Sequence, residues 1–313
     1  MICIPHRKLG TEKKNTQVDK DGFAWYSMLM ENKYRLSEDV SFAMEALGMT
    51  RNQISKEMGV STSDRFHAFS AVEAPSFILE KFYSFAYSHN LRLNRTKVEN
   101  YQELLEKGNL LLFHGSRDGL NDIDPKGSRK ECDFSNGFYC SEFYSSALCF
   151  VEGDADSSIY LFEFSPRGLK IGEYSCDLEW MLSVCYYRGM LRQYSESETL
   201  KRILSKHAKD DVLIAPIADN KRFQIRRRFG NGQITTTQAV HALSAARLGK
   251  QFVFKTDKAV SALKEKERLY LCKAEKEFSK NNSIERGKEI QTKLDFAKRQ
   301  YRNEGLYIDE VLI

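Results

Sequence analysis

The sequence predicts an α+β protein, because strand-like and helix-like segments are mixed irregularly through its central part. Runs rich in β-branched and aromatic residues are typical of strands, whereas apolar residues at three- and four-residue spacing indicate helices. The phosphate-binding patterns GxGxxG and GxxxxGK[ST] are absent from the 313 residues. The sequence therefore favours an α+β fold over a Rossmann or P-loop fold.

Composition restricts the classes of partner. The chain is 42% hydrophobic and 29% charged, as in a soluble globular protein, and no segment reaches the ~18 apolar residues of a membrane helix. The start, "MICIPHRKLG", lacks the apolar core of a secretion signal. Seven cysteines without a CxxC pair argue against zinc and fit reduced thiols. We expect a cytoplasmic protein with no membrane or metal partner, and the net charge of +5 permits an anionic one.

The N-terminal part predicts a flexible tail, residues 1–35, followed by a helical domain, residues 36–92. Within that domain Thr50 can cap a helix, and Gly59 permits a tight turn before a second capped helix. The segment resembles the helix-turn-helix domains of the Cro and repressor type. This resemblance implies DNA contact through residues 50–69.

The expected second helix, "STSDRFHAF", departs from that pattern. Beyond Arg65 and His67 it carries few groups that could contact bases or phosphates. A small helical domain that binds another protein therefore stays open beside DNA binding.

The rest of the chain predicts a mixed domain, residues 93–262, and a helical C-terminal extension, residues 263–313. A helix and connector ending near Gly108 open the mixed domain. Its strand candidates are "LLLFH", "SIYLFEFSP", "LKIGEY", "VLIAPIA" and "KQFVFKT", and its helix candidates are "SEFYSSALCFV", "DLEWMLSVCYYRG" and "TTQAVHALSAAR". The charged extension predicts two helices broken near "SKNNS".

The order of five segments points to a ligand site. A strand ends in "LFHGS", and "DFSNGFYCS", "LEWMLSVCYYRG", "VLIAPIADN" and "GKQFVFKTDKAVSAL" follow. Together they resemble the ADP-ribosyltransferase superfamily, in the His-Tyr-Glu branch of the poly-ADP-ribose polymerases and diphtheria toxin. They are more closely similar to a bacterial family known as a domain of unknown function. The resemblance implies a split β-sheet core around a cleft that binds NAD.

The resemblance also implies a role for individual residues. His114 corresponds to the histidine that bonds the adenosine ribose of NAD, and the backbone of Gly115 to the group that holds the nicotinamide amide. Tyr139 corresponds to the aromatic residue that stacks on the nicotinamide ring. Without the resemblance, aromatic residues such as these would be interpreted as part of the hydrophobic core. The further expected NAD contacts are Ser116, Gly137, Phe138 and, on the other face of the ring, Tyr144.

Gln251 departs from the branch, whose enzymes carry a glutamate on the late strand. That glutamate stabilises the ribosyl cation as nicotinamide leaves, and one preorganised group of this kind is worth roughly 3–4 kcal/mol. Gln251 can bond the ribose 2′-hydroxyl but brings no charge. Glu179 and Asp219 are acids that could substitute, although a surface acid or helix cap is the plainer interpretation of both. We expect Gln251, His114 and Tyr139 to form the catalytic site, and Gln251→Glu to preserve or raise NAD cleavage.

A basic segment, "DNKRFQIRRRFGNGQ", precedes the last strand and is expected to be a mobile loop. ADP-ribosyltransferases present this region to the acceptor, so the resemblance implies acceptor binding by Arg226, Arg227 and Arg228. Such cations suit nucleic acid or the pyrophosphate of NAD. A solvated loop without a partner stays open.

The resemblance thus implies a bacterial mono-ADP-ribosyltransferase that transfers ADP-ribose from NAD to a nucleic acid or protein and releases nicotinamide. An NAD glycohydrolase, with water as acceptor, stays open. So does a non-catalytic protein that senses NAD or binds nucleic acid. A role as a toxin or in phage defence would suit the resembled family, but no residue indicates it.

Overall fold

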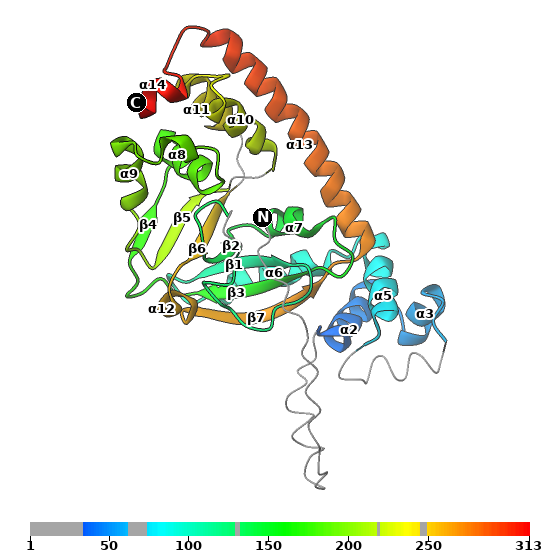
Figure 1. Ribbon diagram of the computed structural model, residues 1–313. Coiled ribbons are helices and arrows are strands. Elements are labelled where there is room, and N and C mark those ends of the chain that lie inside the picture. The colour runs from blue at the N-terminus through cyan, green and yellow to red at the C-terminus, as the bar shows by residue number, and fades with distance from the viewer. Residues whose placement is uncertain (1–33, 62–73, 129–131, 218–219, 245–248) are drawn as a thin grey trace, which may run out of the picture.

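The computed structural model describes residues 34–61, 74–128, 132–217, 220–244 and 249–313. Its centre is a seven-stranded sheet surrounded by helices, which confirms the α+β class (Figure 1). The strand order is β4 (Ile171–Glu173), β5 (Val212–Pro216), β6 (Lys250–Phe254), β2 (Phe138–Ser141), β1 (Leu110–Ser116), β3 (Ser158–Phe164) and β7 (Leu263–Tyr270).

The sheet is made of two halves that meet at one point. β1, β3 and β7 pair antiparallel over long registers, and so do β2, β6 and β5, while β4 is parallel to β5. Between β1 and β2 a single residue pair, Phe113 opposite Ser141, joins the halves. The two groups of strands therefore run in different directions, and the sheet opens at their junction (Figure 1).

All five strand candidates and all three helix candidates of the central part are confirmed. The helices are α7 (Tyr144–Val151), α8 (Leu178–Tyr187) and α11 (Thr236–Ser244). The basic segment was expected as a loop, which is wrong: it forms helix α10 (Asn220–Gly230). Ile225 and Phe229 on this helix are fully buried, so their packing stabilises it. Short elements that the patterns did not indicate are α9 (Glu198–Ser205), α12 (Asp257–Val260), α14 (Ile308–Leu312) and the 3₁₀ turn Arg192–Tyr194.

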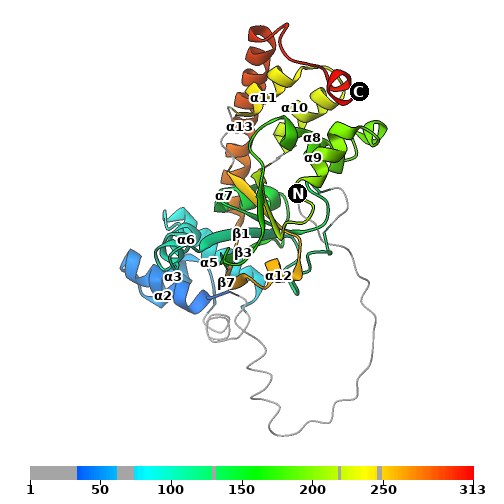
Figure 2. The ribbon, with the colours of Figure 1, turned by 90° about the vertical axis from the view of Figure 1, so that its left-hand side faces the viewer.

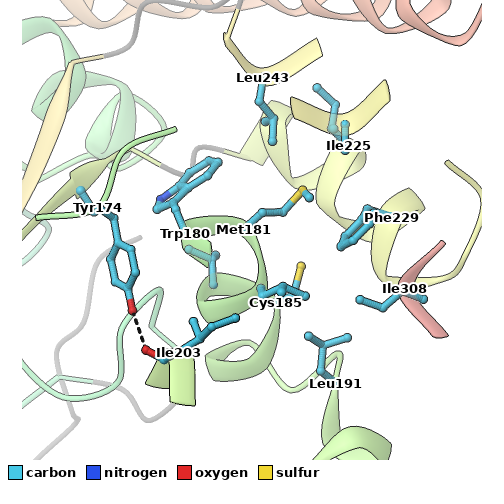
Figure 3. Close-up of a cluster of buried hydrophobic side chains, with 14 of the residues drawn as sticks. Tyr174, Trp180, Met181, Cys185, Leu191, Ile203, Ile225, Phe229, Leu243 and Ile308 are labelled. Carbon is cyan, nitrogen blue, oxygen red and sulfur yellow. Dashed lines mark hydrogen bonds between the residues drawn. The ribbon is translucent and has the colours of Figure 1, made fainter. Parts of the chain in front are cut away.

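The helices beside β4, β5 and β6 enclose the largest apolar core (Figure 3). Trp180 and Met181 of α8 and Phe229 of α10 are fully buried in it. The indole N–H of Trp180 donates a hydrogen bond of 3.2 Å to the Pro216 carbonyl oxygen at the end of β5. This bond ties α8 to the end of the strand beside which the candidate site lies.

The expected C-terminal extension differs from the structure in two ways. Its first residues, 263–270, form the edge strand β7, which pairs with β3 along its length. Helix α13 (Lys273–Gln300) then continues without a break through "SKNNS", where two helices were expected to separate, and the short helix α14 follows it. α13 runs from α5 and α7 to α10 and α11, and Leu294 and Ala297 are buried in the large core (Figure 1). Contacts at both ends therefore outweigh the low helix propensity of its asparagines.

The N-terminal helices are α2 (Leu36–Leu47), α3 (Arg51–Glu57), α5 (Ser76–Ser88) and α6 (Leu93–Glu103). Thr50 caps α3 in a capping box with Gln53, and Gly59 follows with a φ of +61°, as the turn prediction requires. The expected second helix of the helix-turn-helix, with Arg65 and His67, lies outside the described residues.

These helices are not separate from the sheet. Their core includes Cys272 and packs against Tyr270 of β7, and they gather at one end of the sheet (Figure 2). Lys97 of α6 bonds Asp39 of α2 at 2.7 Å and Glu267 of β7 at 2.5 Å. A buried charge network therefore connects the N-terminal helices with the sheet.

Candidate functional site

A cavity of about 590 Å³ lies where the two halves of the sheet meet. β1, β2 and β6 form its floor, and the loop between β1 and β2 forms much of its wall. The described residues that line it are Phe113, His114, Gly115, Asp118, Gly119, Leu120, Asn121, Asp122, Asp124, Lys126, Gly127, Ser128, Gly137, Phe138, Tyr139, Cys140, Ser141, Phe150 and Gln251.

Most of the residues expected at an NAD site therefore line one cavity, although they come from distant parts of the chain. His114, Gly115, Gly137, Phe138, Tyr139 and Gln251 all contribute. Ser116 and Tyr144 are not among the described lining residues. The Ser116 hydroxyl donates to the Gly119 carbonyl oxygen at 2.5 Å, and the Tyr144 hydroxyl donates to Glu275 of α13 at 2.7 Å.

His114 lines the cavity and carries a hydrogen-bond acceptor that no described residue satisfies. Its Nδ1 lies 2.7 Å from the carbonyl oxygen of Tyr139, which can only accept, so Nδ1 carries the proton. Burial lowers the pKa of His114 from 6.5 to about 4, despite that hydrogen bond, and the ring is neutral at neutral pH. Its Nε2 is therefore unprotonated. This buried atom has no partner among the described residues, and a hydroxyl or N–H group of a ligand would satisfy it.

The two aromatic residues of β2 have different surroundings. The ring of Phe138 stacks on the imidazole of His114, with centroids 4.4 Å apart. Tyr139 packs against the large core, where its hydroxyl donates to the Ser135 carbonyl at 2.7 Å and accepts from the Phe134 N–H at 3.1 Å. Burial raises the pKa of Tyr139 well above its usual value, so the phenol stays neutral. Both rings are fixed before a ligand binds.

The glycines of the site are required by the fold itself. A Cβ at Gly115 would stand 2.8 Å from the Ala147 carbonyl and 2.9 Å from Cγ1 of Val151, both on α7. At Gly137 a Cβ would stand 2.5 Å from Cγ1 of Val253 on β6. Close approach of neighbouring elements therefore explains both glycines, independently of any backbone contact with a ligand.

The amide of Gln251 has a fixed orientation. Its Nε2 donates to Oδ2 of Asp133 and to the Pro216 carbonyl oxygen, each at 3.0 Å. These bonds use both N–H groups. The Oε1 atom is left as an acceptor at the cavity, and no group in the described part of the chain donates to it.

Asp133 is a residue of the site that the sequence argument missed. It lies in the loop before β2, is 6% exposed, and accepts a hydrogen bond of 2.6 Å from Nε of Arg188 at the end of α8. Its position in "DFSNGFY" carries no spacing signal, because the residues it contacts are brought to it by the fold. The substitute acid proposed from the sequence, Glu179, instead pairs with Lys206 at 2.7 Å. The other, Asp219, lies outside the described residues.

The charged residues in the described lining of the cavity are mostly acidic. Asp118, Asp122 and Asp124 line it, with Lys126 as the cation among the described lining residues. Of the residues expected to bind the acceptor, Arg226 is fully buried in α10, Arg228 is half-buried and Arg227 is exposed. Of these three arginines, Arg227 is therefore the one that is exposed to solvent.

The described residues contain no group of three or more histidines, cysteines or acids that could hold a metal ion. Five of their cysteines are free: Cys140, Cys149, Cys176, Cys185 and Cys272. In the same part of the chain, no helix combines the length and apolar character that crossing a membrane requires.

The structure is that of an α+β protein with a cavity at the junction of a two-part sheet. Residues 110–264, from the start of β1 into β7, match the model of a family described as "Protein of unknown function (DUF3990)". No curated protein and no solved structure matches the chain. The matched region contains every described residue that lines the cavity.

Proposed function

We propose that the protein is a cytoplasmic mono-ADP-ribosyltransferase that uses NAD as substrate. The observation that carries this proposal is the buried Nε2 of His114, an acceptor without a partner among the described residues, at a cavity that Gln251 also lines. A ribose hydroxyl is a donor of the kind this atom requires. The order of the sequence motifs supports the same assignment.

The proposed reaction breaks the bond between the nicotinamide nitrogen and C1′ of its ribose. Nicotinamide leaves with the bonding electrons, and C1′ gains cationic character. A nucleophilic atom of the acceptor then bonds C1′ and loses its proton. In this proposal Oε1 of Gln251 accepts from the 2′-hydroxyl of the same ribose, which orients the sugar and strengthens as the cation develops.

His114 and Phe138 would hold the other end of the substrate. The neutral imidazole accepts from a hydroxyl of the adenosine ribose, and its stacking on Phe138 fixes the direction of Nε2. Tyr139 also lines the cavity, with its hydroxyl already bonded within the protein, and its ring would contact the nicotinamide ring. We assign these residues to binding and orientation, and we assign no proton transfer to them.

Binding of NAD without cleavage is the second candidate, and one observation favours it. Gln251 lines the cavity but brings no charge toward the ribosyl cation. The carboxylates of Asp118, Asp122 and Asp124, which also line the cavity, would favour contact with the positively charged nicotinamide end of NAD over contact with its pyrophosphate.

The test is incubation of the protein with NAD labelled in its adenylate part and a bacterial lysate, followed by separate protease and nuclease digestion. Label that nuclease releases indicates a nucleic acid acceptor, and label that protease releases indicates a protein. His114→Ala should abolish labelling, whereas His89→Gln, at a histidine that does not line the cavity, should not change it. Free ADP-ribose without labelled macromolecules would indicate a glycohydrolase, and unchanged NAD would contradict the proposal.

A further inference from the structure

Three buried groups from different elements form one hydrogen-bonded chain beside the cavity. Arg188 at the end of α8 donates to Asp133, and Asp133 accepts from Gln251 on β6. The side chains of Arg188 and Asp133 are 5% and 6% exposed, and Gln251 is 7% exposed. Such a buried network is stable only in an arrangement that satisfies its members.

The network distinguishes the two ends of the Gln251 amide. Turning the amide by 180° would place Oε1 against the Asp133 carboxylate and the Pro216 carbonyl, so that acceptors would face acceptors. In the observed orientation the N–H groups face both acceptors and the oxygen remains at the cavity. A carboxylate behind the amide also polarises it and strengthens Oε1 as an acceptor.

We propose that Asp133, held by Arg188, is a positioning residue that fixes Gln251 with its oxygen toward the ribose of the substrate. The catalytic part of this inference depends on the proposed function, whereas the orientation of the amide does not. Asp133 does not line the cavity and acts through Gln251. The carboxylate of Asp133 thus lies next to Gln251, and Gln251 separates it from the substrate.

Asp133→Asn tests the role of the carboxylate. Arg188 holds Oδ1 and requires an acceptor there, so the introduced amide would direct its NH₂ group toward Gln251. Gln251 would then turn its oxygen to that NH₂ group and present N–H groups to the cavity. We expect nicotinamide release to fall roughly tenfold, as for the loss of one hydrogen bond, with little change in KM.

Gln251→Glu supplies a distinctive pH profile. The introduced carboxyl would face Oδ2 of Asp133 and the Pro216 oxygen, so its pKa should be raised and it should donate while protonated. Above that pKa the carboxylates repel each other, and release should decrease as pH rises. The contacts of Gln251 therefore restrict the preserved or raised NAD cleavage expected of Gln251→Glu from the sequence to low pH. In the double variant, Asp133→Asn supplies an NH₂ group that donates to the introduced carboxylate. Only one carboxylate then remains near Arg188, so the pH dependence of nicotinamide release should disappear. We expect nicotinamide release by the double variant to recover only in part, because the Pro216 carbonyl oxygen still lacks the donor that Gln251 supplies in wild type.

The experiment measures nicotinamide release between pH 5.5 and 9 for wild type, the two single variants and the double variant. Glu179→Gln is the matched control, since it removes an ion pair from α8 that does not contact Gln251. Urea unfolding establishes that each variant is folded. A pH profile of Gln251→Glu that is unchanged by Asp133→Asn would overturn the inference.

A second measurement does not depend on NAD. In ¹⁵N NMR spectra, the side-chain NH₂ of Gln251, identified by its loss in Gln251→Glu, should exchange slowly with solvent in wild type. This exchange should be about tenfold faster in Asp133→Asn, since exchange requires the hydrogen-bonded N–H to open. In Glu179→Gln it should be as slow as in wild type. Equal exchange in all three proteins overturns the positioning role. Slow exchange without any nicotinamide release would instead contradict the proposed function and leave the positioning role intact.

Discussion

Acidification should destabilise the protein through His114. The pKa of this buried histidine is lowered from 6.5 to about 4, so on acidification the unfolded chain takes up a proton before the folded protein does. Its contribution to stability is complete above pH 6.5 and is lost as the pH falls toward 4. The difference of about 2.5 pKa units corresponds to about 3 kcal/mol in total, of which about 2 kcal/mol is lost between pH 7 and pH 5.

His114→Gln isolates this contribution. Its amide can still donate to the Tyr139 carbonyl but does not titrate, and other acid-sensitive groups cancel between the two proteins. Urea unfolding at pH 7, 6 and 5 should give a stability difference between wild type and variant that changes by about 2 kcal/mol in favour of the variant. Parallel pH dependences would refute the neutral, Nδ1-protonated histidine and, with it, the acceptor at the cavity.

Further predictions concern packing and buried charge. Gly115→Ala should lower the free energy of unfolding by about 1–3 kcal/mol, because the added Cβ would collide with α7. Gly153→Ala is the control and should change this free energy little, because no atom lies within 4 Å of its Cβ. Equal urea midpoints for the two variants would contradict this prediction. Lys97→Met should cost about 3 kcal/mol, because it removes the cation that the buried carboxylates of Asp39 and Glu267 share and leaves Glu267 only with Arg35 at 4.0 Å. Lys288→Met, in an exposed ion pair with Glu285, is the control and should cost less than about 1 kcal/mol in thermal or urea unfolding.

The parts of the fold that the sequence predicted are those with a strong local pattern. β1, β3 and β6 are apolar runs bounded by turn residues, and α8 begins at a capping aspartate, Asp177. β2 has only four residues and gives too short a pattern. β7, "LKEKERLY", consists largely of helix-forming charged residues, and pairing with β3 determines its conformation.

The candidate site was predictable only as far as its residues belong to motifs. His114, Gly115 and Phe138 stand in short recognisable segments, so their common location could be expected. Tyr144 stands in the same region of sequence, but its hydroxyl bonds Glu275 of α13, a partner that no local pattern indicates. Asp133 illustrates the reverse case. Its importance depends on Arg188 and Gln251, which are distant in sequence and meet it only in the folded protein.

Release of nicotinamide from NAD tests the central claim most directly. Wild type, Gln251→Ala and His114→Ala should be compared over a range of NAD concentrations, with calorimetry to confirm binding. The proposal predicts release by wild type, a lower maximal rate with nearly unchanged NAD affinity for Gln251→Ala, and weaker NAD binding for His114→Ala. NAD binding by wild type without nicotinamide release, in the presence of lysate acceptors and also for Gln251→Glu at low pH, would contradict it.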